Sequence, residues 1–359
     1  MHMADALLAP AVAATMYAAS GVTAGFSIKT LKKDENMAKL PTMAVTAALV
    51  FAGQMINYTI PGTGSSGHLC GGMLLSALLG PQAGFLSMGV ILAIQCLFFA
   101  DGGLMALGAN CWNMAFYGCF IGYYLLWKPI MRSGLFSKKK RANRIKIALA
   151  SILGCTLTLQ LGAFSVVLET SASGITELPF RAFVGIMQPI HLAIGLVEGL
   201  ITTAVLLFVY ETRPEMIMEL NTGKAKEKNR CKLKTTLTVL AVVVVIVGGG
   251  LSLFASQNPD GLEWSMFGNS EAGYSANMNL DEDDYGISSQ AANVAGSIQE
   301  KTAFLPDYAF SESESSSGTS VSGLAGSAIV AAAAVLVCVA GGFFRKKKCA
   351  EKAYRMKKQ

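Results

Sequence analysis

The chain contains only three histidines, His2, His68 and His191, in 359 residues. His2 lies at the N-terminus, and His68 follows the glycine-rich stretch 61–67, where glycines permit tight backbone turns. Imidazole nitrogens are common ligands of transition metals. The chemistry that the chain offers therefore depends on whether these histidines meet in the folded protein.

A histidine in second position has a specific chemical consequence. The α-amine of Met1, the deprotonated amide nitrogen of His2 and the His2 Nδ1 can bind one metal ion through a five-membered and a six-membered chelate ring. These rings favour a planar set of nitrogens, and one more imidazole, such as that of His68, completes a square. Square-planar nitrogen coordination suits Ni(II) and Cu(II), and low-spin Co(II) also accepts it.

A structural explanation of the same residues stays open. A histidine in second position occurs by chance, and a single histidine near a membrane surface is commonly a polar cap rather than a ligand. Taken alone, the residues leave metal binding and a structural role as alternatives.

Other polar side chains could hold the N-terminal segment in place or line a path for an ion. Ionisable residues at membrane depth are costly and usually face the protein interior, which draws attention to His191 and to Glu198, seven residues later on the same helical face. The alternative for each is a satisfied polar contact that fixes helix packing. The candidates are Asn57, Ser65, Ser66, Asp101, Asn110, His191 and Glu198.

The elements that must position these residues are membrane helices. The chain is 52% hydrophobic and 14% charged, whereas soluble domains carry about 25% charged residues. Apolar stretches of spanning length recur, and the alternating pattern of barrel strands is absent. The sequence therefore predicts an all-α membrane protein with spans near residues 6–28, 40–58, 69–81, 84–100, 104–127, 147–168, 181–210, 235–255 and 324–344.

Basic residues predict the orientation of these spans. With an extracytoplasmic N-terminus and one crossing per span, 27 of the 29 Lys and Arg residues fall on the cytoplasmic side, in 29–39, 128–146, 211–234 and 345–359. The outer segment 256–323 carries eleven acidic residues instead. The basic runs favour contact with anionic membrane lipid over binding of nucleic acid. We expect a multi-pass cell-membrane protein whose C-terminus is cytoplasmic.

The chain divides into three parts. Residues 1–213 form a compact hydrophobic unit with seven spans, residues 214–234 a basic cytoplasmic linker, and residues 235–359 a two-helix unit around the outer segment. The first cation, Lys29, follows the first span rather than preceding it, which favours an uncleaved helix over a signal peptide. The sequence also has no Walker-type ATP-binding loop and no His-Glu-x-x-His motif, so we expect no enzyme.

Four stretches of the first unit resemble the CbiM/NikM family, the substrate-binding S components of energy-coupling-factor (ECF) transporters for cobalt and nickel. The C-terminal unit resembles the small CbiN/NikN, or PDGLE-type, component, here fused to the first. The stretches that carry the resemblance are Met1–Asp5, Asn57–Leu69, Asp101–Asn110 and His191–Thr202, and, in the second unit, 259–264 and 305–308.

The resemblance implies a seven-helix core that binds Co(II) or Ni(II) as transported substrate, for cobalamin biosynthesis or for nickel enzymes. It implies Met1, His2 and His68 as metal ligands and no organic cofactor. It also implies two kinds of partner: a transmembrane coupling (T) subunit, for which Ala14 and Ala18 are a docking face, and cytoplasmic ATPases. The alternatives are a non-transporting membrane metal-binding or sensor protein and a self-sufficient secondary carrier, for which we see no internal repeat.

Overall fold

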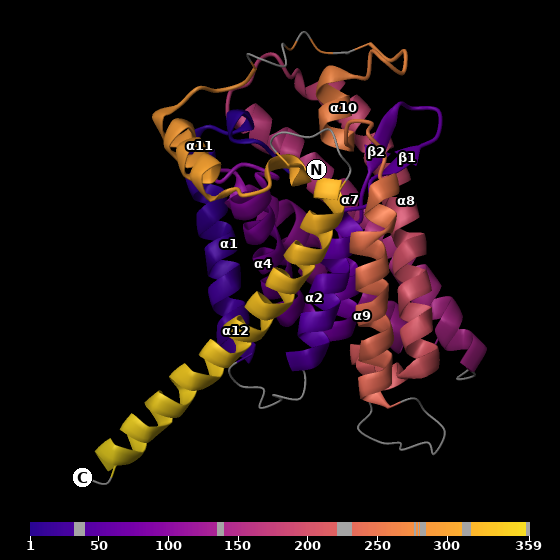
Figure 1. Cartoon of the computed structure of the whole chain (residues 1–359), viewed down its shortest axis with the longest axis vertical. Helices are drawn as coiled ribbons and strands as arrows, with labels where there is room; N and C mark the ends of the chain where they lie inside the picture. Colours follow the sequence, from indigo (N-terminus) through magenta and orange to yellow (C-terminus); the bar gives the residue numbers. More distant parts are fainter. Residues whose placement is uncertain are drawn as a thin grey trace.

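The computed structural model describes residues 1–31, 40–134, 140–220, 232–275, 278, 280, 285–310 and 317–356, with side chains up to residue 336. Six of its helices are long and apolar enough to cross a membrane, and they run side by side through the body of the molecule (Figure 1). This confirms the predicted all-α membrane fold. The six are α1 (Pro10–Leu31), α4 (Pro81–Phe99), α7 (Lys140–Ala172), α8 (Phe180–Thr212), α9 (Leu233–Gly249, continued by η6, Leu251–Phe254) and α12 (Ser317–Met356).

Seven helical segments make up the first unit, as expected, but two are shorter than a span. Helix α2 (Leu40–Gln54) covers about 22 Å, and α3 (Gly72–Leu79) only about 12 Å, against a hydrocarbon core of about 30 Å. The fifth segment is a continuous helix built from α5 (Leu107–Asn110), η3 (Cys111–Trp127) and α6 (Lys128–Arg132).

The expected third span, 69–81, is therefore wrong as a membrane-length helix. Gly71 has a left-handed backbone with φ of 86°, and Gly80 has φ of 87° directly before Pro81 opens α4, so glycines bound α3 on both sides. All residues of α3 are buried, which explains its near-continuous apolar sequence. The polypeptide reaches α3 through non-helical backbone that protein covers, an arrangement that membranes tolerate.

A small antiparallel hairpin precedes α3. Strands β1 (Tyr58–Ile60) and β2 (Ser65–Gly67) pair in the register Tyr58↔Gly67, with a turn between them that contains two glycines of positive φ. His68 follows β2 in irregular backbone, not at the start of a helix as the sequence predicted.

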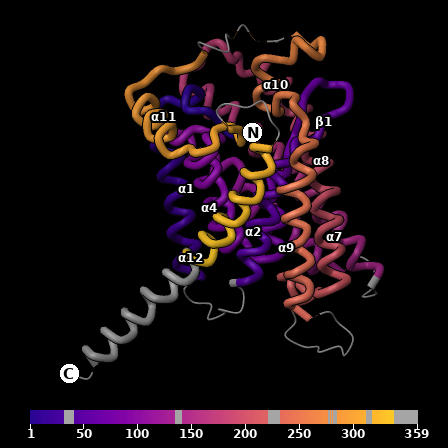
Figure 2. Tube along the Cα trace, in the orientation of Figure 1, coloured from indigo at the N-terminus to yellow at the C-terminus, as the bar shows by residue number. Residues whose placement is uncertain are grey.

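The C-terminal unit packs against the first unit rather than standing apart from it. Helices α9 and α12 contact each other and α2. The segment between them lies over the end of the bundle where the N-terminus is found (Figures 1 and 2). It contains α10 (Gly261–Phe267), α11 (Gln290–Thr302) and η7 (Pro306–Tyr308).

The first part of the predicted linker is also packed. Residues 214–220 form η4 (Pro214–Met216) and η5 (Met218–Leu220), with Met216 and Ile217 buried. Glu219 accepts hydrogen bonds from Tyr123 and Arg132 of the core. Residues 221–231 of the linker lie outside the described residues.

Candidate metal site at the N-terminus

The first residues of the chain fold into the protein. Met1 is 7% exposed and Met3 is fully buried. The amide of Met3 donates to Asn110 Oδ1 at 2.8 Å, and its carbonyl accepts from Asn110 Nδ2 and from the amide of Gly103. The side chain of Asn110 and the amide of Gly103 therefore hold the backbone of Met3 on both its N–H and its carbonyl. The α-amine is consequently fixed inside the molecule.

A second anchor follows in the short helix η1 (Asp5–Leu7). The carboxylate of Asp5 accepts the backbone N–H of Ala106 at 2.9 Å. A Cβ on Gly103 would overlap Asp5, so the turn after α4 needs glycine at this position. The predicted tight turn at Asp101-Gly102-Gly103 thus serves to admit the N-terminal segment.

The two histidines expected to share a site lie together. Their rings are stacked, with centroids 5.4 Å apart and planes 23° apart. Burial lowers the pKa of His2 below its ordinary value and lowers that of His68 to about 4. Both imidazoles are therefore neutral near pH 7 and can offer a lone pair to a metal.

Hydrogen bonds define which nitrogen carries the proton. His68 Nδ1 lies 3.2 Å from the carbonyl oxygen of Leu69, which can only accept, so Nδ1 donates and Nε2 keeps a lone pair. His2 Nδ1 lies 3.1 Å from Asp101 Oδ1, and its buried Nε2 has no partner among the described residues. The predicted chelate uses His2 Nδ1, so the imidazole would have to leave Asp101 to bind a metal. Asp101 also accepts the hydroxyl of Tyr308.

An acidic residue of the C-terminal unit completes the site. The α-ammonium of Met1 forms an ion pair with Asp260 Oδ2. The other oxygen, Oδ1, accepts the amides of Leu262 and Glu263 and so caps α10. Burial alone would raise the pKa of Asp260, but the ammonium and His68 lower it below its usual range. The stretch 259–264 carries part of the family resemblance, but nothing in the sequence indicates that residue 260 contacts residue 1.

Two other candidates, Asn57 and Ser66, hold the C-terminal unit rather than the N-terminal segment, and Ser65 bonds within its own hairpin. The carbonyl of Asn57 accepts the amide of Ser256 at 2.8 Å. Ser66 bonds through its amide to the carbonyl of Pro259 and through its hydroxyl to that of Asn258. Ser65 is buried, and its hydroxyl donates to the neighbouring carbonyl of Ser66. The hairpin therefore aligns the segment that presents Asp260.

His191 and Glu198 lie deeper, on one face of α8, and both are 1% exposed. Glu198 accepts the amides of Cys70 at 3.0 Å and Gly71 at 2.9 Å, which fixes the non-helical segment that follows His68. His191 Nδ1 lies 2.8 Å from the carbonyl of Met187. Pro189 lies inside this helix.

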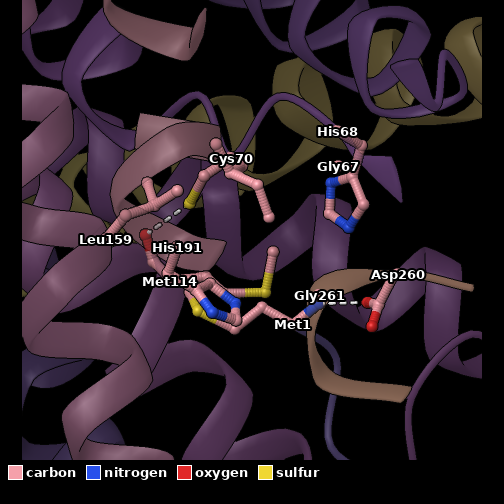
Figure 3. A pocket seen from close by; sticks show the side chains of 10 residues that line it. Met1, Gly67, His68, Cys70, Met114, Leu159, His191, Asp260 and Gly261 are labelled. Atoms are coloured by element: carbon pink, nitrogen blue, oxygen red, sulfur yellow. Dashed lines mark hydrogen bonds and ion pairs between the residues drawn. The ribbon is translucent and has the colours of Figure 1, made fainter. Parts of the chain in front are cut away.

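A small cavity lies between Met1 and His68 on one side and His191 on the other. It has a volume of about 20 Å³, room for about one water-sized particle. Figure 3 shows Met1 between His68 and His191, with the ammonium directed toward Asp260. Among the described residues, no three side chains of His, Cys, Asp or Glu come close enough to hold a metal. The cavity is lined by Met1, Gly67, His68, Cys70, Met114, Leu159, His191, Ile194, Asp260 and Gly261.

The predicted docking residues lie apart from this site. Ala14 and Ala18 are exposed on α1, the helix with the smallest buried share among the six long ones. Gly21 and Gly25 continue the same small-residue side, with no atom near the position of a Cβ.

Comparison with known proteins decides the family. Residues 2–216 match the family model described as "CbiM: Cobalt uptake substrate-specific transmembrane region". The chain belongs to the CbiM family. Residues 234–341 match the PDGLE domain, so a CbiM unit and a PDGLE unit are fused, as the motifs indicated.

Relatives in the CbiM family carry both metals in their names. The chain is 33% identical over 339 residues to a putative fused nickel transport protein NikMN of Archaeoglobus fulgidus, covering 92% of this chain and 96% of that one. It is 31% identical over 178 residues to the cobalt transport protein CbiM of Sorangium cellulosum, covering 49% and 76% respectively. A crystal structure of a truncated transition metal transporter matches with a TM-score of 0.50 at 30% identity, over 59% of this chain and 99% of that one. The chain is a multi-pass membrane protein of a cobalt and nickel transport family, which is not a class of enzymes.

Proposed function

We propose that this chain captures Ni(II) or Co(II) at an extracytoplasmic site made by its own N-terminus and delivers the ion to an ATP-driven ECF importer. The ligands are the amine of Met1, the amide nitrogen and Nδ1 of His2, and Nε2 of His68. The observation that carries this proposal is the burial of the α-amine beside two neutral imidazoles.

The ion replaces contacts that already exist in the metal-free site. The amine gives up its ion pair with Asp260, and His2 Nδ1 gives up Asp101. Turning the His2 ring about its side-chain bonds brings Nδ1 onto the chelate plane, and the Nδ1 proton that Asp101 accepted moves to Nε2. The bond from His68 Nδ1 to Leu69 already leaves Nε2 as the donor atom, so His68 needs no change of tautomer.

The remaining polar residues support the ligands. Asn110 holds Met3 next to the chelate, and Glu198 holds the segment after His68. Ligands held by such bonds bind more tightly, because less ordering is left for the moment of binding.

The proposed capture site and the ATPases lie on opposite sides of the membrane. The charge distribution supports an extracytoplasmic N-terminus and a cytoplasmic C-terminus, with the capture site at the outer end of the bundle. The chain has no ATP-binding loop of its own, so cytoplasmic ATPases and a T subunit supply the energy, with the exposed Ala14 and Ala18 side of α1 as the docking face. Free Ni(II) and Co(II) differ mainly in preferred geometry, so both are proposed substrates.

The test compares the metal content of the purified full chain with that of a variant carrying one extra residue before Met1. The insertion leaves both histidines intact but breaks the amine–amide–imidazole chelate. We expect about one Ni(II) or Co(II) per wild-type chain and none in planar coordination in the variant. His68→Ala should show the same loss. Equal planar binding by wild type and extended variant would contradict the N-terminal site.

A further inference from the structure

A second nitrogen faces the cavity beneath the proposed capture site. His191 is 1% exposed in the middle of α8. Its Nδ1 lies 2.8 Å from the carbonyl of Met187, and because a carbonyl only accepts, Nδ1 carries the proton. The lone pair therefore lies on Nε2, which is buried and has no hydrogen-bond partner among the described residues. A buried acceptor without a partner is costly, so a particle bound in the adjoining cavity would lower that cost.

The surroundings of Nε2 fit a metal ion better than a second protein group. Nε2 opens toward the cavity, and the backbone of Gly261 closes one side, where a Cβ would lie 3.3 Å from this nitrogen. The cavity walls also include the sulfur-bearing side chains of Cys70 and Met114. Imidazole with soft sulfur atoms nearby is a setting that borderline divalent metals accept.

The same cavity touches the capture ligands. Met1 and His68 line it from one side and His191 from the other, with Met1 between the two rings in Figure 3. An ion leaving the planar site toward the membrane interior therefore meets the next nitrogen without crossing an apolar layer. About two turns farther along α8, the buried Glu198 places a carboxylate on the same face of the helix.

We propose that His191 Nε2 is the first inner ligand on the transport path, a transfer position to which Ni(II) or Co(II) passes from the N-terminal chelate. This inference rests on the proposed function and extends it inward. The step is a ligand exchange: the ion exchanges the nitrogens of His2 for Nε2 of His191, while Met1 and His68 can stay bound. One of the two protons lost when the chelate formed returns to the amide nitrogen of His2, while the amine of Met1 stays deprotonated on the ion. His191 releases no proton, because its Nε2 is already unprotonated.

The experiment uses the purified full chain with Ni(II) and Co(II) as probes. His2→Ala removes the planar chelate without adding bulk to the cavity. We expect this variant to lose the planar spectrum and to bind one ion more weakly, on the order of 100-fold, in a non-planar environment visible in the electronic spectrum of Co(II). Adding His191→Phe, which keeps a ring and removes both nitrogens, should weaken that residual binding by at least about tenfold. In the wild-type background, His191→Phe should leave the planar site within about threefold.

Thr202→Val is the matched control, because Thr202 is fully buried on the same helix and does not line the cavity. It should leave residual binding in the His2→Ala background unchanged. If that residual binding is absent, or survives His191→Phe, the inner ligand is overturned while the capture site stands. If His191→Phe alone abolishes the planar site, His191 acts on capture and the transfer position is likewise overturned. A wild-type chain that binds neither metal would overturn the proposed function itself.

Discussion

Two carboxylates flank the proposed metal site, and they use their oxygens differently. Asp260, from the C-terminal unit, pairs with the α-ammonium of Met1, a group that the proposed ion must bind. Glu198, from α8, accepts two backbone amides of the segment that follows His68. The first carboxylate therefore touches a ligand and the second touches only the support of a ligand. Proximity to the site does not by itself tell which acid governs binding.

The net charge that Asp260 faces can be compared before and after the proposed ion binds. In the metal-free site, the ammonium contributes one positive charge and the His2 amide none. When a divalent ion binds, the amine and the amide each lose a proton, so two positive charges are added and two are removed. Asp260 thus faces the same net charge before and after loading. It is a counter-ion for both states, whereas Glu198 determines the geometry of His68 in both.

The largest expected effect is that of Glu198→Ala. It leaves the amides of Cys70 and Gly71 buried without an acceptor, at about 1–3 kcal/mol each. We expect a clearly lower midpoint of thermal unfolding and loss of bound Ni(II) through a displaced His68. Glu198→Gln keeps one acceptor oxygen and should lose less of both. Unchanged stability and metal content in the alanine variant would show that the support is dispensable.

The proton count is the next measurement. Burial lowers the pKa of His2 below its ordinary value and that of His68 to about 4, so both rings are already neutral at pH 7 and release no proton when metal binds. Calorimetry of Ni(II) binding at pH 7 in buffers of different ionisation enthalpy should therefore count about two protons, from the amine and the amide. A count near four would mean that the histidines are charged in the empty protein, and the charge argument for Asp260 would fail.

The smallest expected effect is that of Asp260→Asn on Ni(II) affinity. Asparagine caps a helix about as well as aspartate, so α10 should keep its start. Because the carboxylate stabilises the empty and the loaded site alike, we expect the equilibrium affinity to change by less than about threefold. A competitive titration against a chelator measures this. A change beyond about tenfold in either direction would assign Asp260 to one state alone.

Much of this architecture could be predicted from the sequence, since lipid demands long apolar helices and charges orient them. The partnership of His2 with His68 followed from the chelate chemistry of a histidine in second position, and their stacked rings are consistent with it. What could not be predicted were features set by long-range packing. The run 69–81 has the composition of a span, yet left-handed glycines limit its helix to Gly72–Leu79.

The contact of Asp260 with Met1 illustrates the other limit. The capping chemistry of Asp260 with Glu263 is local and readable in the motif. The ion pair joins residues 259 positions apart and depends on how the hairpin β1–β2 aligns the segment through Ser66. No local pattern carries that information. Similarly, the unpaired Nε2 of His191 emerges only when the partner of Nδ1 is known.

The ion pair between the first residue and residue 260 also bears on how the protein is made. At a synthesis rate of about 5–20 residues per second, Asp260 leaves the ribosome roughly 13–52 s after Met1. In the proposed topology, Met1 crosses the membrane before Asp260 has been made, and its amine gains this partner only after most of the chain has been inserted. Met1 is thus synthesised well before its final contact exists, and a nascent chain stalled before residue 260 would lack the ion pair.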